Sequence, residues 1–173
     1  MKIENLLPIA LLIFGITTNC SDSKASKNNS TSESIDPKVE KQAILERLNN
    51  ETKDAFSRNY EAWTTNWVHD PNISKVYINF VDSTFSESMG WSEISKFVQV
   101  FMDEHPEPEP IPELFNEITV RLYGNGAWVT YEQKDSLRGL KRETRLMEKI
   151  DGVWKIAGMQ TSIYGFKTKE IVK

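Results

Sequence analysis

The chain has 173 residues, of which 39% are hydrophobic and 10% aromatic, which suits one folded domain with a single core. Its formal net charge is -4, and Lys and Arg are scattered along the sequence. The chain therefore lacks the stripe of positive charge that nucleic-acid binding requires, which argues against DNA or RNA as a partner. One cysteine and two distant histidines exclude an intramolecular disulfide and argue against a metal site, and we expect no cofactor.

The first twenty residues are typical of a targeting segment. Residues 6–18 are apolar but too few to cross a bilayer core of about 30 Å, as in a secretory signal peptide. The run ends in Thr17-Thr18-Asn19-Cys20, which resembles the lipobox of bacterial lipoproteins, although that family prefers Leu in place of Thr17 and Gly or Ala in place of Asn19. We expect residues 1–19 to be a signal peptide and Cys20 to carry the lipid. The alternatives are an ordinary cleaved signal with an incidental cysteine and a retained membrane anchor.

A polar segment separates Cys20 from the folded part of the chain. Residues 21–34 are almost entirely Ser, Lys, Asn, Asp and Thr, and they offer no apolar surface that could offset the entropy of ordering. Asp36 and Pro37 then supply a helix N-cap and a proline at the first helical position. We therefore predict a disordered tether over residues 20–35 and one domain over residues 36–173.

Apolar spacing predicts three helices in the first half of the domain. Residues 37–57 form an amphipathic pattern, residues 60–68 place Trp63 and Trp67 one turn apart, and residues 94–101 follow i, i+3, i+4, i+7 spacing. A β-rich, alternating run at residues 76–82 predicts one strand before the third helix.

The second half of the domain reads as an extended crossover followed by a meander. Alternating prolines at residues 105–112 favour a stiff extended path, with a docking peptide as the alternative. Strands are expected at residues 116–123, 127–133, 140–150 and 153–164. Asp151-Gly152 predicts a two-residue type I′ hairpin loop between the last two.

This order of elements resembles the nuclear transport factor 2-like superfamily, which includes SnoaL-like and ketosteroid-isomerase-like proteins. The likeness extends over residues 38–165 and rests on Gly90-Trp91-Ser92-Glu93-Ile94 and on Asp151-Gly152-Val153-Trp154 in the last hairpin. It implies an α+β fold in which a curved antiparallel sheet is wrapped by three helices into a cone with an apolar pocket, often as a homodimer. Many relatives carry a His six residues after the hairpin Trp, where this chain has Gln160, which cannot titrate.

The hairpin register yields the first set of candidate ligand-binding residues. A two-residue loop pairs Arg145 with Gly158 and Glu143 with Gln160 and puts seven side chains on one face: Glu143, Arg145, Met147, Trp154, Ile156, Gln160 and Ser162. Arg145 beside Gly158 could then receive an anionic or carbonyl group. The alternative is that these polar residues lie on a solvated outer face, as a one-residue slip would also produce.

Aromatic and titratable residues complete the candidate site. The mouth of a cone could be lined by Trp63, Trp67, Tyr77, Phe101 and Tyr131, although such spacing is also that of a plain core. His69 and Asp70 are a candidate catalytic pair, but Asp-Pro after a helix is also simple stop chemistry. His105 suits a structural role at the end of the third helix.

Three hypotheses for function follow. The first is a cell-envelope lipoprotein whose domain binds a small, partly apolar ligand or a partner protein without catalysis. The second is a pocket enzyme of the isomerase, dehydratase or hydrolase kind that uses Glu143, His69 or Asp70 as acid and base. The third is a structural dimerisation module. In each, the membrane is contacted only through the lipid, and nucleic acid is not a partner.

The lipoprotein hypothesis makes a direct prediction about Cys20. Cys20→Ser removes the acylation site, and stable anchoring needs acyl chains, so the variant should move from the membrane to the soluble fraction. Fractionation of cells expressing either chain, followed by immunoblotting, measures this. Unchanged membrane association of the variant would contradict the lipid anchor.

Overall fold

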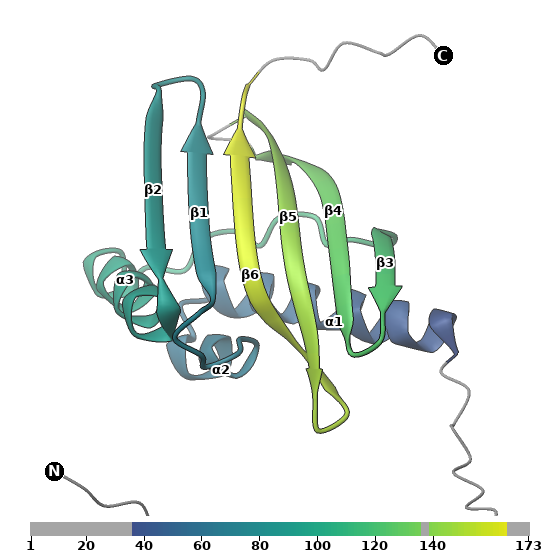
Figure 1. Ribbon diagram of the computed structural model, residues 1–173. Coiled ribbons are helices and arrows are strands. Elements are labelled where there is room, and N and C mark those ends of the chain that lie inside the picture. The colour runs from purple at the N-terminus through teal and green to yellow at the C-terminus, as the bar shows by residue number, and fades with distance from the viewer. Residues whose placement is uncertain (1–35, 136–138, 166–173) are drawn as a thin grey trace, which may run out of the picture. The chain divides into compact units, whose positions relative to one another are not determined.

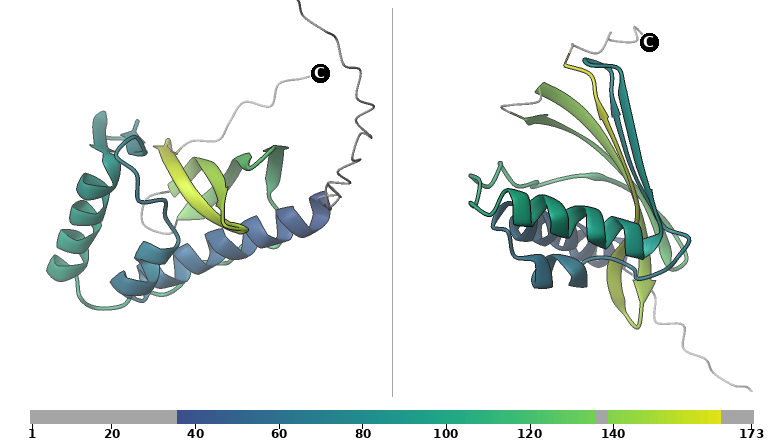
Figure 2. Two further views of the ribbon diagram at one scale, coloured as in Figure 1. Left: turned by 60° about the horizontal axis from the view of Figure 1, so that its bottom comes forward. Right: turned by 90° about the vertical axis from the view of Figure 1, so that its left-hand side faces the viewer.

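One curved six-stranded sheet carries all three helices on its concave face (Figures 1 and 2). This architecture comes from a computed structural model that describes residues 36–135 and 139–165. The predicted signal peptide, Cys20 and the tether of residues 20–35 lie outside the described residues. The elements in chain order are α1 (Pro37–Phe56), α2 (Tyr60–Thr65), β1 (Ser74–Asn79), β2 (Thr84–Met89), α3 (Gly90–Glu104), β3 (Thr119–Tyr123), β4 (Gly126–Asp135), β5 (Gly139–Ile150) and β6 (Val153–Ile163).

Helix α1 begins as the sequence predicts. The Asp36 side chain accepts a hydrogen bond from the backbone N–H of Lys38 at 2.9 Å, and Pro37 occupies the first turn. Ile44 and Leu48 are fully buried against the sheet, and Glu51 continues the same stripe one turn later. The long first helix thus brings a carboxylate to the concave face.

Helix α2 is shorter than predicted because its last residues join the sheet. The helix ends at Thr65, and the backbone of Asn66 and Val68 then bonds to Ile156 of β6 at 2.8 Å in each direction. Helix α3 begins at Gly90, whose φ is +74°. A Cβ there would lie 2.9 Å from the carbonyl oxygen of Pro71, so glycine permits the abrupt change from strand to helix.

The sheet order is β2-β1-β6-β5-β4-β3, and the sheet is mixed rather than antiparallel. All neighbouring strands are antiparallel except β1 and β6, which run parallel. The predicted antiparallel sheet is wrong at this one pair because the β1–β2 hairpin attaches to the meander through its first strand. Strand β2 was missed because its sequence, TFSESM, is mostly polar and exposed, and pairing with β1 defines it.

A β-bulge changes the register of the last hairpin. The Asp151-Gly152 loop pairs Ile150 with Val153 as predicted, but the register shifts between Leu146 and Met147. Ala157 is the extra residue, since Met147 pairs with Ile156 and Leu146 with Gly158. The shift occurs where the neighbour of β6 changes. Ile156 pairs with Trp67, in the segment after α2, whereas Gly158 and the residues after it pair with β1.

The bulge overturns part of the predicted inner face. Arg145 pairs with Met159 rather than Gly158, and Glu143 pairs with Thr161 rather than Gln160. Side chains alternate along a strand, so the one-residue shift turns Gln160 outward and Thr161 inward. The predictions for Glu143, Arg145, Met147, Trp154 and Ile156 as buried residues survive. The extra residue lies in β6, so the alternation of side chains along β5 is unchanged, and Trp154 and Ile156 precede it on β6.

The core lies between the helices and the concave face of the sheet. Its largest fully buried side chains include Trp63, Trp67, Ile94, Met147 and Ile156. Within residues 36–135 and 139–165, no helix is long and apolar enough to cross a membrane.

Candidate functional site

A cavity of about 410 Å³ separates the helices from the concave face of the sheet. Helix α1, helix α3 and strands β1, β2, β4, β5 and β6 all contribute to its wall. Six aromatic side chains line it: Phe56, Trp63, Tyr77, Phe97, Phe101 and Tyr131. A partly aromatic hollow of this size is typical of a small-molecule site.

Neighbouring strands supply the polar part of the wall in aligned rows. Because alternate side chains share a face, β1, β6 and β5 place matched residues side by side on the concave surface. One row holds Lys75, Met159 and Arg145, and the next holds Tyr77, Thr161 and Glu143. The parallel pairing of β1 with β6 therefore brings Lys75 into the same cavity as the charged residues of β5.

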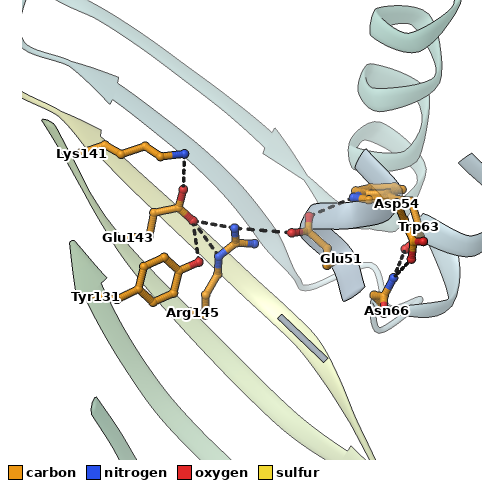
Figure 3. Close-up of polar contacts among 8 residues, drawn as sticks. All are labelled: Glu51, Asp54, Trp63, Asn66, Tyr131, Lys141, Glu143 and Arg145. Carbon is orange, nitrogen blue, oxygen red and sulfur yellow. Dashed lines mark hydrogen bonds and ion pairs between the residues drawn. The ribbon is translucent and has the colours of Figure 1, made fainter. Parts of the chain in front are cut away.

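Glu143 is the centre of a buried cluster on β4 and β5 (Figure 3). Its Oε2 accepts hydrogen bonds from Nε and Nη2 of Arg145 at 3.0 and 2.5 Å. The Tyr131 hydroxyl donates to the same oxygen at 3.0 Å, and Nζ of Lys141 lies 3.0 Å from Oε1. Both oxygens of this carboxylate thus contact donors of the protein.

Glu51 extends the cluster to helix α1 (Figure 3). Its Oε2 lies 3.7 Å from Nη2 of Arg145, and its Oε1 accepts a hydrogen bond from the indole Nε1 of Trp63 at 2.9 Å. Polar contacts thus join helix α1 to β5 at the wall of the cavity, beside the apolar core.

The cluster keeps Glu143 ionised. Burial raises the pKa of Glu143, but attraction to Arg145 and Lys141 and their hydrogen bonds outweigh it and lower that pKa to about 2. Burial raises the pKa of Tyr131 well above its ordinary value, so the phenol stays protonated and donates to the carboxylate. At neutral pH, Glu143 has no proton to give.

Two buried polar atoms in this wall have no partner among the described residues. They are Nη1 of Arg145 and Oγ1 of Thr161. Both residues line the cavity and are almost fully buried. Leaving a buried polar group unpaired costs about 1–3 kcal/mol, so each of these atoms would gain from a ligand atom in the cavity.

Lys75 is the cationic side chain that lines the cavity without an ion pair. It is 6% exposed, and neither a carboxylate nor a hydrogen-bond acceptor among the described residues contacts its ammonium. Its Nζ instead lies 5.5 to 5.8 Å from the centroids of four rings: Trp63, Trp67, Tyr77 and Phe97. Cation–π attraction of about 2 kcal/mol offsets only part of the several kcal/mol that desolvation of an ammonium costs.

The proline-alternating crossover contributes Glu109 to the wall of the cavity. Arg58 lies two residues after the end of α1, with φ +62°. It donates to the carbonyl of His105 at 2.7 Å and pairs with Glu109 at 2.5 Å. Its guanidinium also lies over the ring of Phe101, 5.3 Å from the centroid. Residues 105–112 form the predicted crossover, and Arg58 fixes it at His105 and Glu109.

Six of the nine predicted ligand-binding residues line this cavity: Trp63, Tyr77, Phe101, Tyr131, Glu143 and Arg145. The other three do not. Trp67 is fully buried in the core, and the indole of Trp154 donates to Glu40 of α1 at 2.6 Å. Gln160 is exposed on the outer face, 3.5 Å from Ser162, because of the bulge.

The structure does not bring the predicted catalytic pair, His69 and Asp70, to the cavity. The exposed His69 ring stacks on Trp91 with centroids 3.9 Å apart, and its Nε2 lies 3.0 Å from the carbonyl oxygen of Thr64. Asp70 accepts from the backbone and side-chain amides of Asn72 and borders a separate hollow of about 590 Å³. Both residues thus stabilise the turn after α2 through contacts with its backbone.

Sequence reasoning missed three important residues of the cavity, and two of them had a signal. Lys75 lies two positions before Tyr77 in a strand, so alternation places them on one face. Glu51 follows Ile44 and Leu48 on the buried stripe of α1. No sequence signal indicated Thr161, because the hydrophobic pattern does not reveal the bulge that turns its side chain inward.

The outer face of the sheet has a different character. Trp128 of β4 and Leu146 of β5 are paired and are 46% and 39% exposed. Within the described ranges, no group of three or more His, Cys, Asp or Glu side chains is placed to hold a metal ion.

No protein-family model and no curated protein matches the sequence. Solved structures do match. A nuclear transport factor 2 (NTF2-like) superfamily protein from Salmonella enterica is 18% identical, with a TM-score of 0.57 over 79% of this chain and 99% of that chain. The domain has the nuclear transport factor 2-like fold, as the sequence predicted.

Other nuclear transport factor 2-like structures support the same fold. A cystatin-like fold protein from Burkholderia xenovorans is 18% identical, with a TM-score of 0.56 over 76% of this chain and 95% of that chain. An NTF2-like family protein from Streptomyces avermitilis, provisionally named a dehydratase, is 16% identical, with a TM-score of 0.57 over 74% and 98% of the chains. At these identities the likeness concerns the fold and not the reaction.

The buried cluster predicts how stability depends on Glu143 and pH. Glu143→Gln leaves Arg145 and Lys141 without their shared carboxylate, so the free energy of unfolding should fall by about 3 kcal/mol. The folded-state pKa of about 2 lies below the ordinary value of 4.5, so the ionised carboxylate stabilises the fold above about pH 4.5. That contribution disappears as the pH falls from 4.5 towards 2.

Urea unfolding at several pH values measures both effects. Glu148→Gln, on the exposed outer face of the same strand, is the matched control and should change stability by less than about 0.5 kcal/mol. The wild-type protein should lose stability between pH 4.5 and 2 more steeply than Glu143→Gln. Parallel pH profiles for these two proteins would contradict the ionised, paired state of Glu143.

Proposed function

We propose that the domain binds a small, partly apolar molecule in the cavity, and that a lipid on Cys20 holds it at the bacterial cell envelope. The observation that carries the binding proposal is the composition of the cavity wall. Six aromatic side chains line it, and the buried Nη1 of Arg145 and Oγ1 of Thr161 have no partner among the described residues. Apolar area gives a ligand affinity, and a few fixed polar atoms orient it.

Binding is better supported than acid–base catalysis. A general acid or base works best with a pKa near the operating pH, whereas the pKa of Glu143 is about 2. His69 and Asp70, the other two candidates, do not line the cavity. The dehydratase name belongs to a neighbour that shares only the fold, so it adds nothing specific to this chain.

Dimerisation is a second candidate, and it concerns the opposite face of the sheet. Trp128 and Leu146 lie side by side and exposed there, so a second copy of the domain could bury them. This surface and the cavity lie on different faces, and a dimer would leave ligand binding unobstructed.

Narrowing the cavity should weaken binding. Ser86 of β2 is exposed, lines the cavity and pairs with Tyr77, so Ser86→Trp should fold and fill part of the space. The neutral fluorescent probe N-phenyl-1-naphthylamine reports entry into an apolar cavity. Its affinity, measured by titration with full-length Cys20→Ser protein free of detergent, should fall about tenfold in Ser86→Trp.

The neighbouring residue provides the control. Glu87→Trp adds the same side chain at an exposed position that does not line the cavity, and it should leave probe affinity unchanged. Equal probe affinity in Ser86→Trp and Glu87→Trp, or no probe binding to the parent protein, would contradict the proposed function.

A further inference from the structure

Lys75 gives the cavity an unbalanced positive charge. Four basic and three acidic side chains line it, and each acidic one lies within ion-pair distance of a basic one: Glu109 with Arg58, Glu143 with Lys141 and Arg145, and Glu51 with Arg145. Lys75 is the remaining cation. The wall therefore has one positive charge in excess, at a position set by β1.

The four aromatic rings around Lys75 hold its ammonium in place but accept no hydrogen bonds from it. Ring faces attract a cation, but they accept none of the three hydrogen bonds that an ammonium can donate. Glu51 is near enough to contact the same tryptophan, Trp63, yet its oxygens are directed to the indole N–H and to Arg145. The cation is thus fixed at the cavity surface with its hydrogen-bond donors available.

We infer that the ligand of this cavity is a small organic monoanion, a carboxylate on an apolar body, whose carboxylate pairs with Lys75. The inference rests on the proposed function and specifies its ligand class. A monoanion matches the single excess charge, whereas a cationic ligand would add a second positive charge to a poorly hydrated space. The aromatic wall then accommodates the apolar body.

The geometry of the sheet also orients this ligand. Lys75, Met159 and Arg145 form one row across three adjacent strands, so the Cα atoms of Lys75 and Arg145 are about 10 Å apart at the usual strand spacing. Met159 between them offers an apolar surface. The unpaired Nη1 of Arg145 and Oγ1 of Thr161 then lie where they could bond a second oxygen of the ligand, such as a carbonyl or hydroxyl.

Matched pairs of an acid and its primary amide test the inference. The pairs are naphthalene-1-acetate with naphthalene-1-acetamide, and octanoate with octanamide, titrated calorimetrically at neutral pH into full-length Cys20→Ser protein. The acid of at least one pair should bind about tenfold tighter than its amide, because it adds a charge-assisted contact. This comparison needs no substitution at Lys75.

Substitution of Lys75 then assigns the preference to one residue. Lys75→Met should abolish the preference for the acid and leave amide affinity unchanged, and Lys75→Gln should do the same. Lys96→Met, the same substitution at an exposed position of α3 outside the cavity wall, should keep the preference. The Tm of Lys75→Met should be no lower than that of the parent, whereas a merely structural lysine would lower it.

Three results would overturn the inference: equal affinity for acid and amide in the parent protein, a preference that persists in Lys75→Met, and no binding of any acid. If N-phenyl-1-naphthylamine still binds the parent and is excluded by Ser86→Trp, the cavity remains a ligand site and only its anion selectivity is refuted. If the neutral probe also fails to bind, the proposed function fails as well.

Discussion

Two carboxylates and one guanidinium are buried between helix α1 and the sheet, and their mutual neutralisation is the constraint on which the site depends. Glu51 and Glu143 both contact Arg145, and Lys141 completes the balance. Buried ion pairs of this kind add little net stability compared with apolar packing, but they are very costly to break. Their role here is geometric, because the charged contacts fix Glu51 of the helix and Glu143 of the sheet in the wall of the cavity. Lys75 remains outside this balance, and so the cavity keeps a positive charge.

Most of the fold could be predicted because its signals are local. Asp36 and Pro37 begin the first helix, and Asp151 and Gly152 make a two-residue hairpin loop as their sequence requires. The parallel pairing of β1 with β6 could not be predicted, because it joins residues 84 positions apart, such as Ser74 and Gly158, that share no turn. Strand β2 also gave no signal, since its polar residues form a strand only beside β1.

The candidate site was predictable up to the bulge and not beyond it. Glu143 and Arg145 face inward as the hairpin register implies, whereas Gln160 faces outward and Thr161 takes its place. The bulge occurs where β6 changes its neighbour, and that exchange is a tertiary event without a sequence pattern. Lys75 is a different case: simple alternation places it beside Tyr77, but a lysine in a strand is ordinarily assigned to solvent.

The central claim is that the cavity binds a small carboxylate through Lys75, and a crystal structure with naphthalene-1-acetate tests it most directly. The account predicts the naphthalene ring between the helices and the concave face, with a carboxylate oxygen about 2.7–3.2 Å from Nζ of Lys75. A ring bound elsewhere on the domain, or a carboxylate directed away from Lys75 into solvent, would contradict it.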